Sequence, residues 1–157
     1  MVTPQLIDMD FNKYLLTLKN KLLHPANWQK VIMTRLWSSQ IPSVAGVYIF
    51  KEKEEIVYVG ETGNLQGRMT DFLDSRHHTI RRTIGQTFFS TQSGFIQATS
   101  KSKFPEHIEI LVNDHIVTNL SLAFLEVPLG RKELEELIES EMILEIRLNK
   151  RGKRKTK

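Results

Sequence analysis

The stretch that decides the fold is residues 46–68, GVYIFKEKEEIVYVGETGNLQGR. Its two runs GVYIF and IVYVG are rich in β-branched and aromatic residues, and the charged letters KEKEE stand between them. This order predicts a β-hairpin with a solvated turn. If the turn is centred on Lys53, Tyr48 lies directly opposite Tyr58, with the two Cβ atoms about 5 Å apart.

Side chains alternate across a strand, so each run of the hairpin has two faces. Val47 and Ile49 are expected to face the core together with Val57 and Val59. The other face is expected to carry Tyr48, Phe50, Ile56 and Tyr58. Two phenols would then stand side by side on one face, and Gly46 and Gly60 flank them without side chains, which leaves room for a second backbone.

The tripeptides GVY (46–48) and YVG (58–60), followed by Thr62, the pair Asn64-Leu65, and Arg68, resemble the GIY-YIG nuclease family. In that family two such tripeptides on neighbouring strands precede a helix that carries an arginine. The resemblance continues less strictly through His78 and an acidic helix to Asn149. It implies an enzyme that cuts DNA.

Composition sets the broad class of the protein. A chain of 157 residues is one ordinary domain, long enough to bury a core. It has no cysteine, which excludes disulfides and thiolate metal sites. The opening MVTPQLIDMDFNKY lacks the basic start and apolar core of a signal peptide, and no apolar run reaches membrane-spanning length, so a cytoplasmic protein without a membrane partner is expected.

The patterns along the chain predict an α+β domain with a small three-stranded antiparallel sheet flanked by helices. The expected helices are 11–23, 27–37, 64–74 with Asn64 as its N-cap, 77–84 closed by Gly85, 105–113 and 131–146. The expected strands are the two runs of the hairpin and 120–127. Residues 1–42 are interpreted as a helical extension, 43–150 as the nuclease-like domain and 151–157 as a basic tail. The extension is expected to pack on the sheet, with dimer formation or DNA contact as alternatives.

Three side chains of the 46–68 stretch could carry the chemistry of phosphodiester hydrolysis. Arg68 offers a fixed fork of donors to the scissile phosphate and stays charged at any working pH. Tyr48 could take a proton from the attacking water, although a free phenol has a pKa of about 10 and needs a nearby cation to serve at neutral pH. Tyr58 would position water or phosphate, with an ordinary cross-strand aromatic pair as the competing interpretation.

The resemblance also implies a divalent cation, Mg²⁺ or Mn²⁺, held by one carboxylate of the late helix, which suits the habits of magnesium. Family members commonly show a glutamate, then two other residues, then a Leu-Ile-like pair, and Glu139, followed by Ser140, Glu141 and the pair Met142-Ile143, fits this pattern best. Glu141 and Glu136 are the reserves, because the usual proline before the terminal asparagine is missing. Asn149 is expected to close the helix and to hydrogen-bond phosphate or a tyrosine, or to be a simple C-terminal cap.

The family often has a histidine or tyrosine one helical turn after the arginine, and this chain has Phe72 there. His77 or His78 could substitute, and His78 stands where some members carry another active-site histidine. A surface or capping histidine is the alternative.

Contacts with DNA are expected from several polar and basic positions. The residues assigned to substrate binding are Gly60, Thr62, Asn64, Arg81, Arg82, Lys150, Arg151, Lys153 and Arg154. Seven lysines or arginines and no acidic residue follow from Arg147 onward, a composition that suits phosphates.

The function expected first is a metal-dependent DNA endonuclease, and the length favours a small restriction-type or mobile-element enzyme. The main alternative is a nucleic-acid-binding module of the same fold with little or no turnover. A protein-interaction domain built on the N-terminal helices is a third interpretation, and a homodimer is left open.

Overall fold

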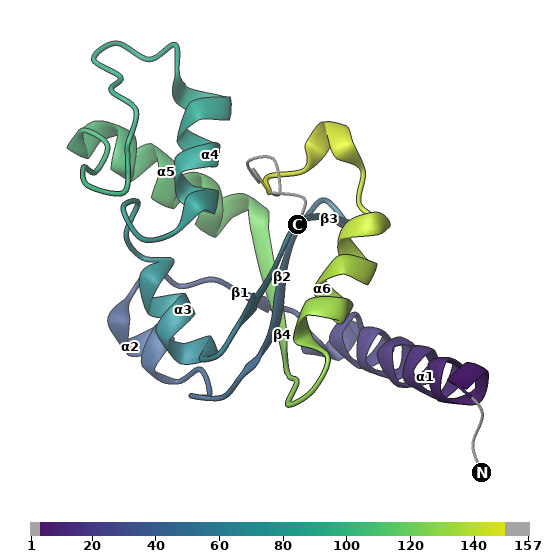
Figure 1. Ribbon diagram of the computed structural model, residues 1–157. Helices are drawn as coiled ribbons and strands as arrows, with labels where there is room; N and C mark the ends of the chain where they lie inside the picture. Colours follow the sequence, from purple (N-terminus) through teal and green to yellow (C-terminus); the bar gives the residue numbers. More distant parts are fainter. Residues whose placement is uncertain (1–3, 150–157) are drawn as a thin grey trace.

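The computed structural model describes residues 4–149 and shows one four-stranded antiparallel sheet between two layers of helices (Figure 1). Along the chain the elements are α1 (Pro4–Leu22), the 3₁₀ turn η1 (Pro25–Asn27), β1 (Gln29–Lys30), α2 (Arg35–Ser39), β2 (Gly46–Glu52), β3 (Glu55–Thr62), α3 (Leu65–Asp71), α4 (Thr79–Phe89), α5 (Glu106–Asn119), β4 (Leu120–Glu126), α6 (Arg131–Ser140) and the 3₁₀ turn η2 (Leu144–Ile146). The strand order is β1-β4-β2-β3. The α+β class is therefore as predicted, but the number of strands is not.

The strand that the sequence analysis missed is β1, which pairs with β4 through Gln29 and Leu122. The prediction of a second long helix over 27–37 is wrong, because this segment contains β1 and only the short helix α2. Two residues are too few for an alternation pattern. The free edge of β4, rather than any local propensity, gives this segment its extended form.

The β2–β3 hairpin closes with a two-residue turn at Lys53 and Glu54, whose φ angles of 50° and 68° are those of a type I′ turn. The register then shifts after Phe50, so that Phe50 pairs with Tyr58 and Tyr48 pairs with Gly60. The predicted direct pairing of Tyr48 with Tyr58 is wrong by two positions.

The cause of the shift is a β-bulge that leaves one extra residue, Val57, on β3. The bulge exchanges the faces of two neighbours. Val57 packs on the side of Tyr48 and Phe50, and Ile56 packs on the opposite side, the reverse of the prediction for both residues.

One helical layer consists of α2 to α5 and covers the face of the sheet that carries the tyrosines (Figure 1). Phe50 stacks on Phe72 of α3 with ring centroids 4.8 Å apart, and Ile84 of α4 and Ile108 of α5 are fully buried in the same core. Burial of each such side chain stabilises the fold by about 1.5–3 kcal/mol. The layer thereby fixes α3 and α4 against the tyrosine face.

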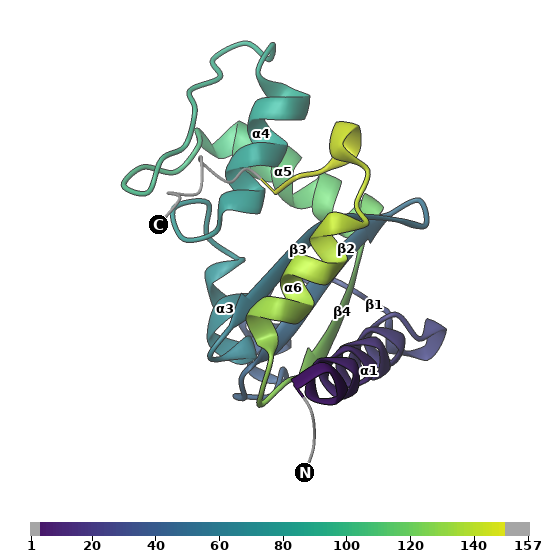
Figure 2. The ribbon, with the colours of Figure 1, turned by 45° about the vertical axis from the view of Figure 1, so that its right-hand side comes forward.

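The other layer consists of α1 and α6, and Figure 2 shows α6 lying over β2 and β3 with α1 beside it. Leu18 and Leu22 of α1 and Leu134 and Ile138 of α6 share a second core with Ile49. The N-terminal helix therefore packs on the sheet, the first of the three roles expected for it.

Several helix boundaries differ from the predictions. α1 begins at Pro4 instead of 11, and α3 ends at Asp71 instead of 74. Gly85 does not end α4, because the helix runs to Phe89 and the ring of Phe104 packs against the bare Cα of the glycine, where a Cβ would lie 2.7 Å from Cε1. α5 continues to Asn119, and α6 ends at Ser140 instead of 146. No helix within residues 4–149 is long and apolar enough to cross a bilayer.

Candidate active site

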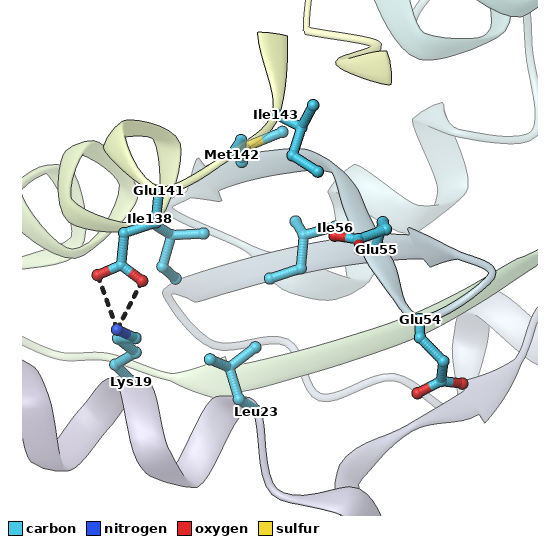
Figure 3. A pocket seen from close by; sticks show the side chains of 9 residues that line it. All are labelled: Lys19, Leu23, Glu54, Glu55, Ile56, Ile138, Glu141, Met142 and Ile143. Atoms are coloured by element: carbon cyan, nitrogen blue, oxygen red, sulfur yellow. Dashed lines mark hydrogen bonds and ion pairs between the residues drawn. The ribbon is translucent and has the colours of Figure 1, made fainter. Parts of the chain in front are cut away.

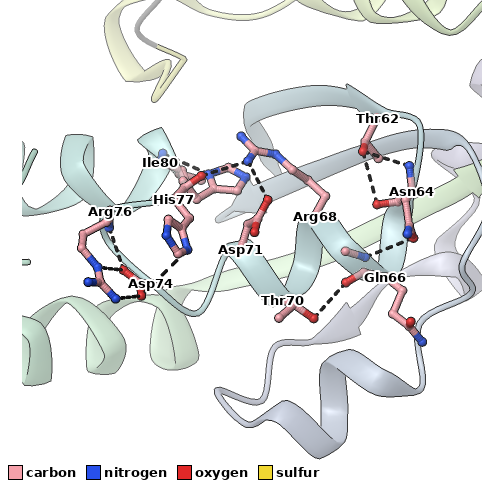
Figure 4. Close-up of polar contacts among 12 residues, drawn as sticks. Thr62, Asn64, Gln66, Arg68, Thr70, Asp71, Asp74, Arg76, His77 and Ile80 are labelled. Carbon is pink, nitrogen blue, oxygen red and sulfur yellow. Dashed lines mark hydrogen bonds and ion pairs between the residues drawn. The ribbon is translucent and has the colours of Figure 1, made fainter. Parts of the chain in front are cut away.

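The helix that carries Arg68 is started by a side-chain cap. Asn64 Oδ1 accepts a hydrogen bond from the Gly67 amide (3.1 Å), which confirms the predicted N-cap. The Thr62 hydroxyl accepts from the Asn64 amide (3.1 Å) and also contacts its carbonyl oxygen (3.2 Å) (Figure 4). Thr62 and Asn64, predicted to bind substrate, thus both serve here to shape the turn that aims α3 at the tyrosines.

Arg68 is held by three partners. Its Nε donates to the Tyr48 hydroxyl oxygen (3.3 Å). Its Nη1 donates to the His77 carbonyl oxygen (2.9 Å) and lies 3.4 Å from Asp71 Oδ2 (Figure 4). Within residues 4–149 no partner is recorded for Nη2. About a quarter of the side chain is exposed, so this nitrogen is the group best placed to bind an incoming phosphate oxygen.

The Tyr48 hydroxyl oxygen receives a second contact, from Nε2 of His78 at 3.0 Å. His78 Nδ1 accepts from the Ile80 amide at the start of α4 (3.2 Å), so it carries no proton. Burial, with Arg68 the next cause, holds the pKa of His78 well below its usual value, and the ring is neutral. The proton of this neutral imidazole must therefore lie on Nε2, and His78 donates to Tyr48.

The phenol of Tyr48 is therefore oriented by two N–H donors. Its side chain is 1% exposed, and burial, with Tyr58 the next cause, raises its pKa well above the usual value, against the lowering effect of Arg68. The hydroxyl is thus neutral at neutral pH. Since both acceptor positions of the oxygen are used, the hydroxyl proton is left to donate in a third direction.

Tyr58 lies diagonally from Tyr48, with the rings stacked at 5.9 Å and 27°. The two phenols therefore stand side by side despite the shifted register, because a shift of two positions keeps both on one face. His78 also fills the space beside Phe72, with ring centroids 5.4 Å apart. The imidazole comes from the start of α4 rather than from α3.

Gly60 is the residue paired with Tyr48, and its missing side chain makes room for the phenol. A Cβ at Gly60 would lie 2.7 Å from Cε1 of Tyr48 and nearer still to Cζ and the hydroxyl oxygen. Gly60, predicted to bind substrate, thus also keeps the tyrosine ring in place over the sheet.

A cavity of about 210 Å³ opens where these residues meet β3, the edge strand of the sheet. It is lined by Tyr48, Tyr58, Val59, Gly60, Glu61, Arg68, Thr79, Glu135 and Asn149. The tyrosines and Arg68 lie on one face of the sheet, and Glu135 of α6 lies on the other. Because β3 is the edge strand, side chains from both faces line the same cavity.

Val59, Glu61, Thr79 and Glu135 line the cavity but were not predicted as site residues, and of the two carboxylates among them Glu135 is the buried one, with 7% of it exposed. The helical periodicity of the sequence could have identified Glu135. At 100° per residue, Glu135 projects next to Ile138 and Met142 on the apolar stripe of α6, and a carboxylate at such a position is unusual.

The three glutamates that were predicted as metal ligands lie elsewhere. Glu139, one turn beyond Glu135, is 3.4 Å from Arg147 and lines a different hollow, which Glu136 also lines. Glu141 forms an ion pair of 2.6 Å with Lys19 of α1 (Figure 3). None of the three lines the tyrosine cavity, although Glu136 and Glu139 lie on α6 as Glu135 does.

Asn149 lies at the cavity but not at a helix end, so the predicted helix-closing role is wrong. Its Oδ1 accepts from the Val59 amide (2.9 Å), and its Nδ2 donates to the Val59 carbonyl oxygen (2.8 Å). The Leu148 amide donates to the carbonyl oxygen of the bulged residue Val57 (2.6 Å). The C-terminal segment thereby forms hydrogen bonds with backbone groups of the edge strand on both sides of Tyr58.

Arg81 and Arg82 differ in their availability. Arg81 is 2% exposed and pairs with Glu109 at 2.8 Å, a placement that does not fit the predicted contact with a DNA phosphate. Arg82 is half-buried, and its Nη1 donates to the carbonyl oxygens of Ser75 (3.0 Å) and Arg76 (2.8 Å). The remaining predicted contacts, Lys150, Arg151, Lys153 and Arg154, lie outside the described residues.

The donor set of the cavity fits one hard divalent cation with few protein ligands. Within residues 4–149 no group of three or more His, Cys, Asp or Glu side chains could hold a metal. A single buried carboxylate, Glu135, lies in the same cavity as Arg68. Magnesium binds in this manner, through one or two carboxylates with phosphate oxygens and waters completing the shell.

Comparison with known proteins gives one match over most of the chain. A family model described as the GIY-YIG catalytic domain matches residues 13–157. No curated protein sequence matches.

Among solved structures, the N-terminal endonuclease domain of UvrC from Thermotoga maritima is similar in two forms. A tyrosine-to-phenylalanine point mutant bound to its catalytic divalent cation is 19% identical and covers 74% of this chain and 94% of its own, with a TM-score of 0.40. The form bound to magnesium is 17% identical, with the same coverage and TM-score.

Proposed function

Because this chain belongs to the GIY-YIG catalytic-domain family, we propose that it is a divalent-metal-dependent endonuclease that hydrolyses phosphodiester bonds of DNA. One observation carries the proposal. The N–H groups of Arg68 and His78 converge on the Tyr48 oxygen in a cavity that also contains the buried carboxylate of Glu135. A phosphate-binding cation, an oriented phenol and a carboxylate are the parts that phosphodiester hydrolysis needs.

Arg68 binds the scissile phosphate in this proposal. Two of its guanidinium nitrogens are fixed by protein acceptors, so Nη2 is presented in a set direction. A preorganised donor of this kind stabilises charge that develops in the transition state more than it stabilises the ground state.

Tyr48 orients the attacking water through its hydroxyl group. To act as the base it must first lose its own proton to solvent, and the resulting phenolate then accepts a proton from the water. The two N–H donors to Tyr48 favour the phenolate, whereas burial favours the neutral phenol. Additional positive charge in the site would therefore shift this equilibrium towards the phenolate. We assign Glu135 as the ligand of the Mg²⁺ or Mn²⁺ ion, in place of Glu139. Such a cation would polarise the phosphate and supply positive charge to the groups around it.

Tyr58 and Asn149 act on the position of these groups. Tyr58 stacks on Tyr48, and Asn149 fixes the backbone of the residue that follows Tyr58. The cavity also faces the side of α4 that carries Thr79, which leaves a path for a nucleic-acid strand past the β3 edge. The expectation of a restriction-type or mobile-element role remains a prediction.

The test is cleavage of a labelled DNA duplex with Mg²⁺ and with EDTA. We expect cuts with Mg²⁺ alone, and none from an Arg68→Ala variant purified in parallel, which excludes a contaminating nuclease. Salt-dependent binding without cleavage would reject the endonuclease and favour the alternative of a catalytically weak binding module.

A further inference from the structure

A second hollow, of about 290 Å³, adjoins the active-site cavity, because Thr79 lines both. Its other lining residues are Arg82, Thr83, Gln86 and Gln97. All five side chains carry hydrogen-bonding groups. The roles proposed for catalysis use none of Thr83, Gln86 or Gln97.

Four of the five residues lie on one face of α4. Thr79, Arg82, Thr83 and Gln86 follow the spacing i, i+3, i+4, i+7, which places them in one row along the helix. The major groove of DNA admits an α-helix, where glutamine and threonine reach base edges and arginine reaches bases or phosphates. The row therefore has the composition of a surface that reads nucleic acid.

Gln97 adds an acceptor in a fixed orientation. Its Nε2 donates to the carbonyl oxygens of Arg82 and Ala98, both at 3.2 Å, so the amide nitrogen faces two acceptors and its orientation is determined. The Oε1 atom is buried and has no hydrogen-bond partner in the described part of the chain. A buried acceptor without a partner is costly, so a ligand that brings a donor would be favoured there.

Arg82 supplies the charge. Its Nη1 is anchored by the carbonyl oxygens of Ser75 and Arg76, which holds the guanidinium at the wall of the hollow. A guanidinium fixed in this way suits a phosphodiester group.

We propose that this hollow holds a nucleotide next to the scissile phosphate, with its phosphate at Arg82 and its base read by the row on α4 and by Gln97. Because Gln97 offers only an acceptor, the base is one with an exocyclic amino group, adenine or cytosine, whose N–H donors distinguish it from guanine and thymine in the major groove. The proposal rests on the proposed function, since it places the nucleotide relative to the bond that is cut.

The test uses a duplex library with randomised bases, read in two ways with the full-length protein. In EDTA the bound pool is separated and sequenced, and with Mg²⁺ the ends of cut products are sequenced. The variants are Gln86→Ala, whose side chain makes no hydrogen bond within residues 4–149, and Thr83→Val, which keeps the shape of the residue. Gln92→Ala, an exposed glutamine in the loop after α4, is the matched control, and thermal melting verifies that all variants fold.

Wild type is expected to enrich adenine or cytosine at one position beside the cut in both pools. Gln86→Ala and Thr83→Val should each reduce the enrichment by about two- to tenfold, as the loss of one neutral hydrogen bond predicts, and Gln92→Ala should keep it. An unbiased wild-type bound pool, or a bias that survives both substitutions, would overturn the subsite whether or not DNA is cut. A bias that the two variants lose, without any cleavage, would retain the subsite and reject the endonuclease.

Discussion

The substitution Gly60→Ala tests whether Tyr48 needs the space above Gly60 to hold the position proposed for catalysis. The added Cβ would lie 2.7 Å from Cε1 of Tyr48 and nearer to Cζ and the hydroxyl oxygen. Non-bonded carbon atoms prefer about 3.5–4.0 Å, so the ring or the strand must move by about 1 Å. The ring has little freedom, since it is 1% exposed and its oxygen is bonded to His78 and Arg68.

The expected cost follows from this lack of freedom. Overpacking a close-packed site destabilises a protein by about 1–3 kcal/mol, and the lower chain entropy of alanine recovers about 0.4–1 kcal/mol of it. For a domain of this size each kcal/mol lowers Tm by about 2–4 °C. A displacement of 1 Å at a catalytic group can reduce turnover about 100-fold. Gly60→Ala should therefore lower cleavage far more than it lowers stability.

Single-turnover cleavage and thermal melting measure the two effects. The matched control is Gly63→Ala, three residues further along, where a Cβ would meet only Arg131 Nη1 at 3.6 Å. The control should melt at or slightly above the wild-type temperature and cut at the wild-type rate. If Gly60→Ala behaves in the same way as Gly63→Ala, Tyr48 does not need its observed position and the reasoning is refuted.

Three other predictions concern Tyr48, the ion pair of Asp74 and the basic tail. Tyr48→Phe should reduce turnover by at least about 100-fold, and because it leaves the buried N–H of His78 without an acceptor it should also cost about 1–3 kcal/mol of stability, which turnover and melting measure together; an unaffected rate would remove the phenol from the chemistry. The side-chain hydrogen bond from Arg76 holds the pKa of Asp74 well below its usual value, so this pair contributes stability that is present above the ordinary carboxyl range and is lost as pH falls towards the lowered pKa. Denaturant unfolding of Asp74→Asn between pH 7 and 2 should therefore show a flatter acid limb than wild type, and parallel limbs would show that the ion pair has no such role. Deletion from Lys150 onward should weaken DNA binding and flatten its dependence on salt, because fewer counterions are released, whereas an unchanged slope in a salt titration would exclude phosphate contacts by the tail.

Alternation along the two runs of the hairpin was enough to predict that Tyr48 and Tyr58 share a face and that Val47 and Ile49 face the other core. It could not predict the register. Val57 and its neighbour Ile56 are both apolar and β-branched, so the sequence looks the same whether or not Val57 forms a bulge. Only the pairing of whole strands decides this.

The metal carboxylate proposed here differs from the predicted one for a related reason. A family pattern assigned Glu139 by its distance from a Leu-Ile-like pair, whereas we propose Glu135 because its turn of α6 lines the cavity at the β3 edge. The periodicity of α6 placed Glu135 beside its apolar stripe. The position of α6 on the sheet depends on its contacts with α1 and β3. These contacts cannot be read from the sequence of α6, so the periodicity did not predict that Glu135 lies near the tyrosines.

The positions of Arg81 and Asn149 could not be predicted either, because their partners are distant in the sequence. Arg81 is drawn inside by Glu109, 28 residues away, and Asn149 pairs with Val59 across 90 residues. No local pattern contains either partner. The N-cap at Asn64, by contrast, depends on a residue three positions away and was predicted correctly.

The central claim is that a metal-dependent nuclease site is built from Arg68, Tyr48 and Glu135 at the edge of β3. Magnesium-dependent cleavage by Glu135→Gln and by Glu139→Gln, measured at equal concentrations of folded protein, tests it most directly, because the two residues are one helical turn apart and only Glu135 lines the cavity. The structure predicts that Glu135→Gln loses cleavage at every Mg²⁺ concentration while it still binds DNA, and that Glu139→Gln cuts at close to the wild-type rate. Loss of cleavage in Glu139→Gln with a normal rate in Glu135→Gln would contradict the site described here.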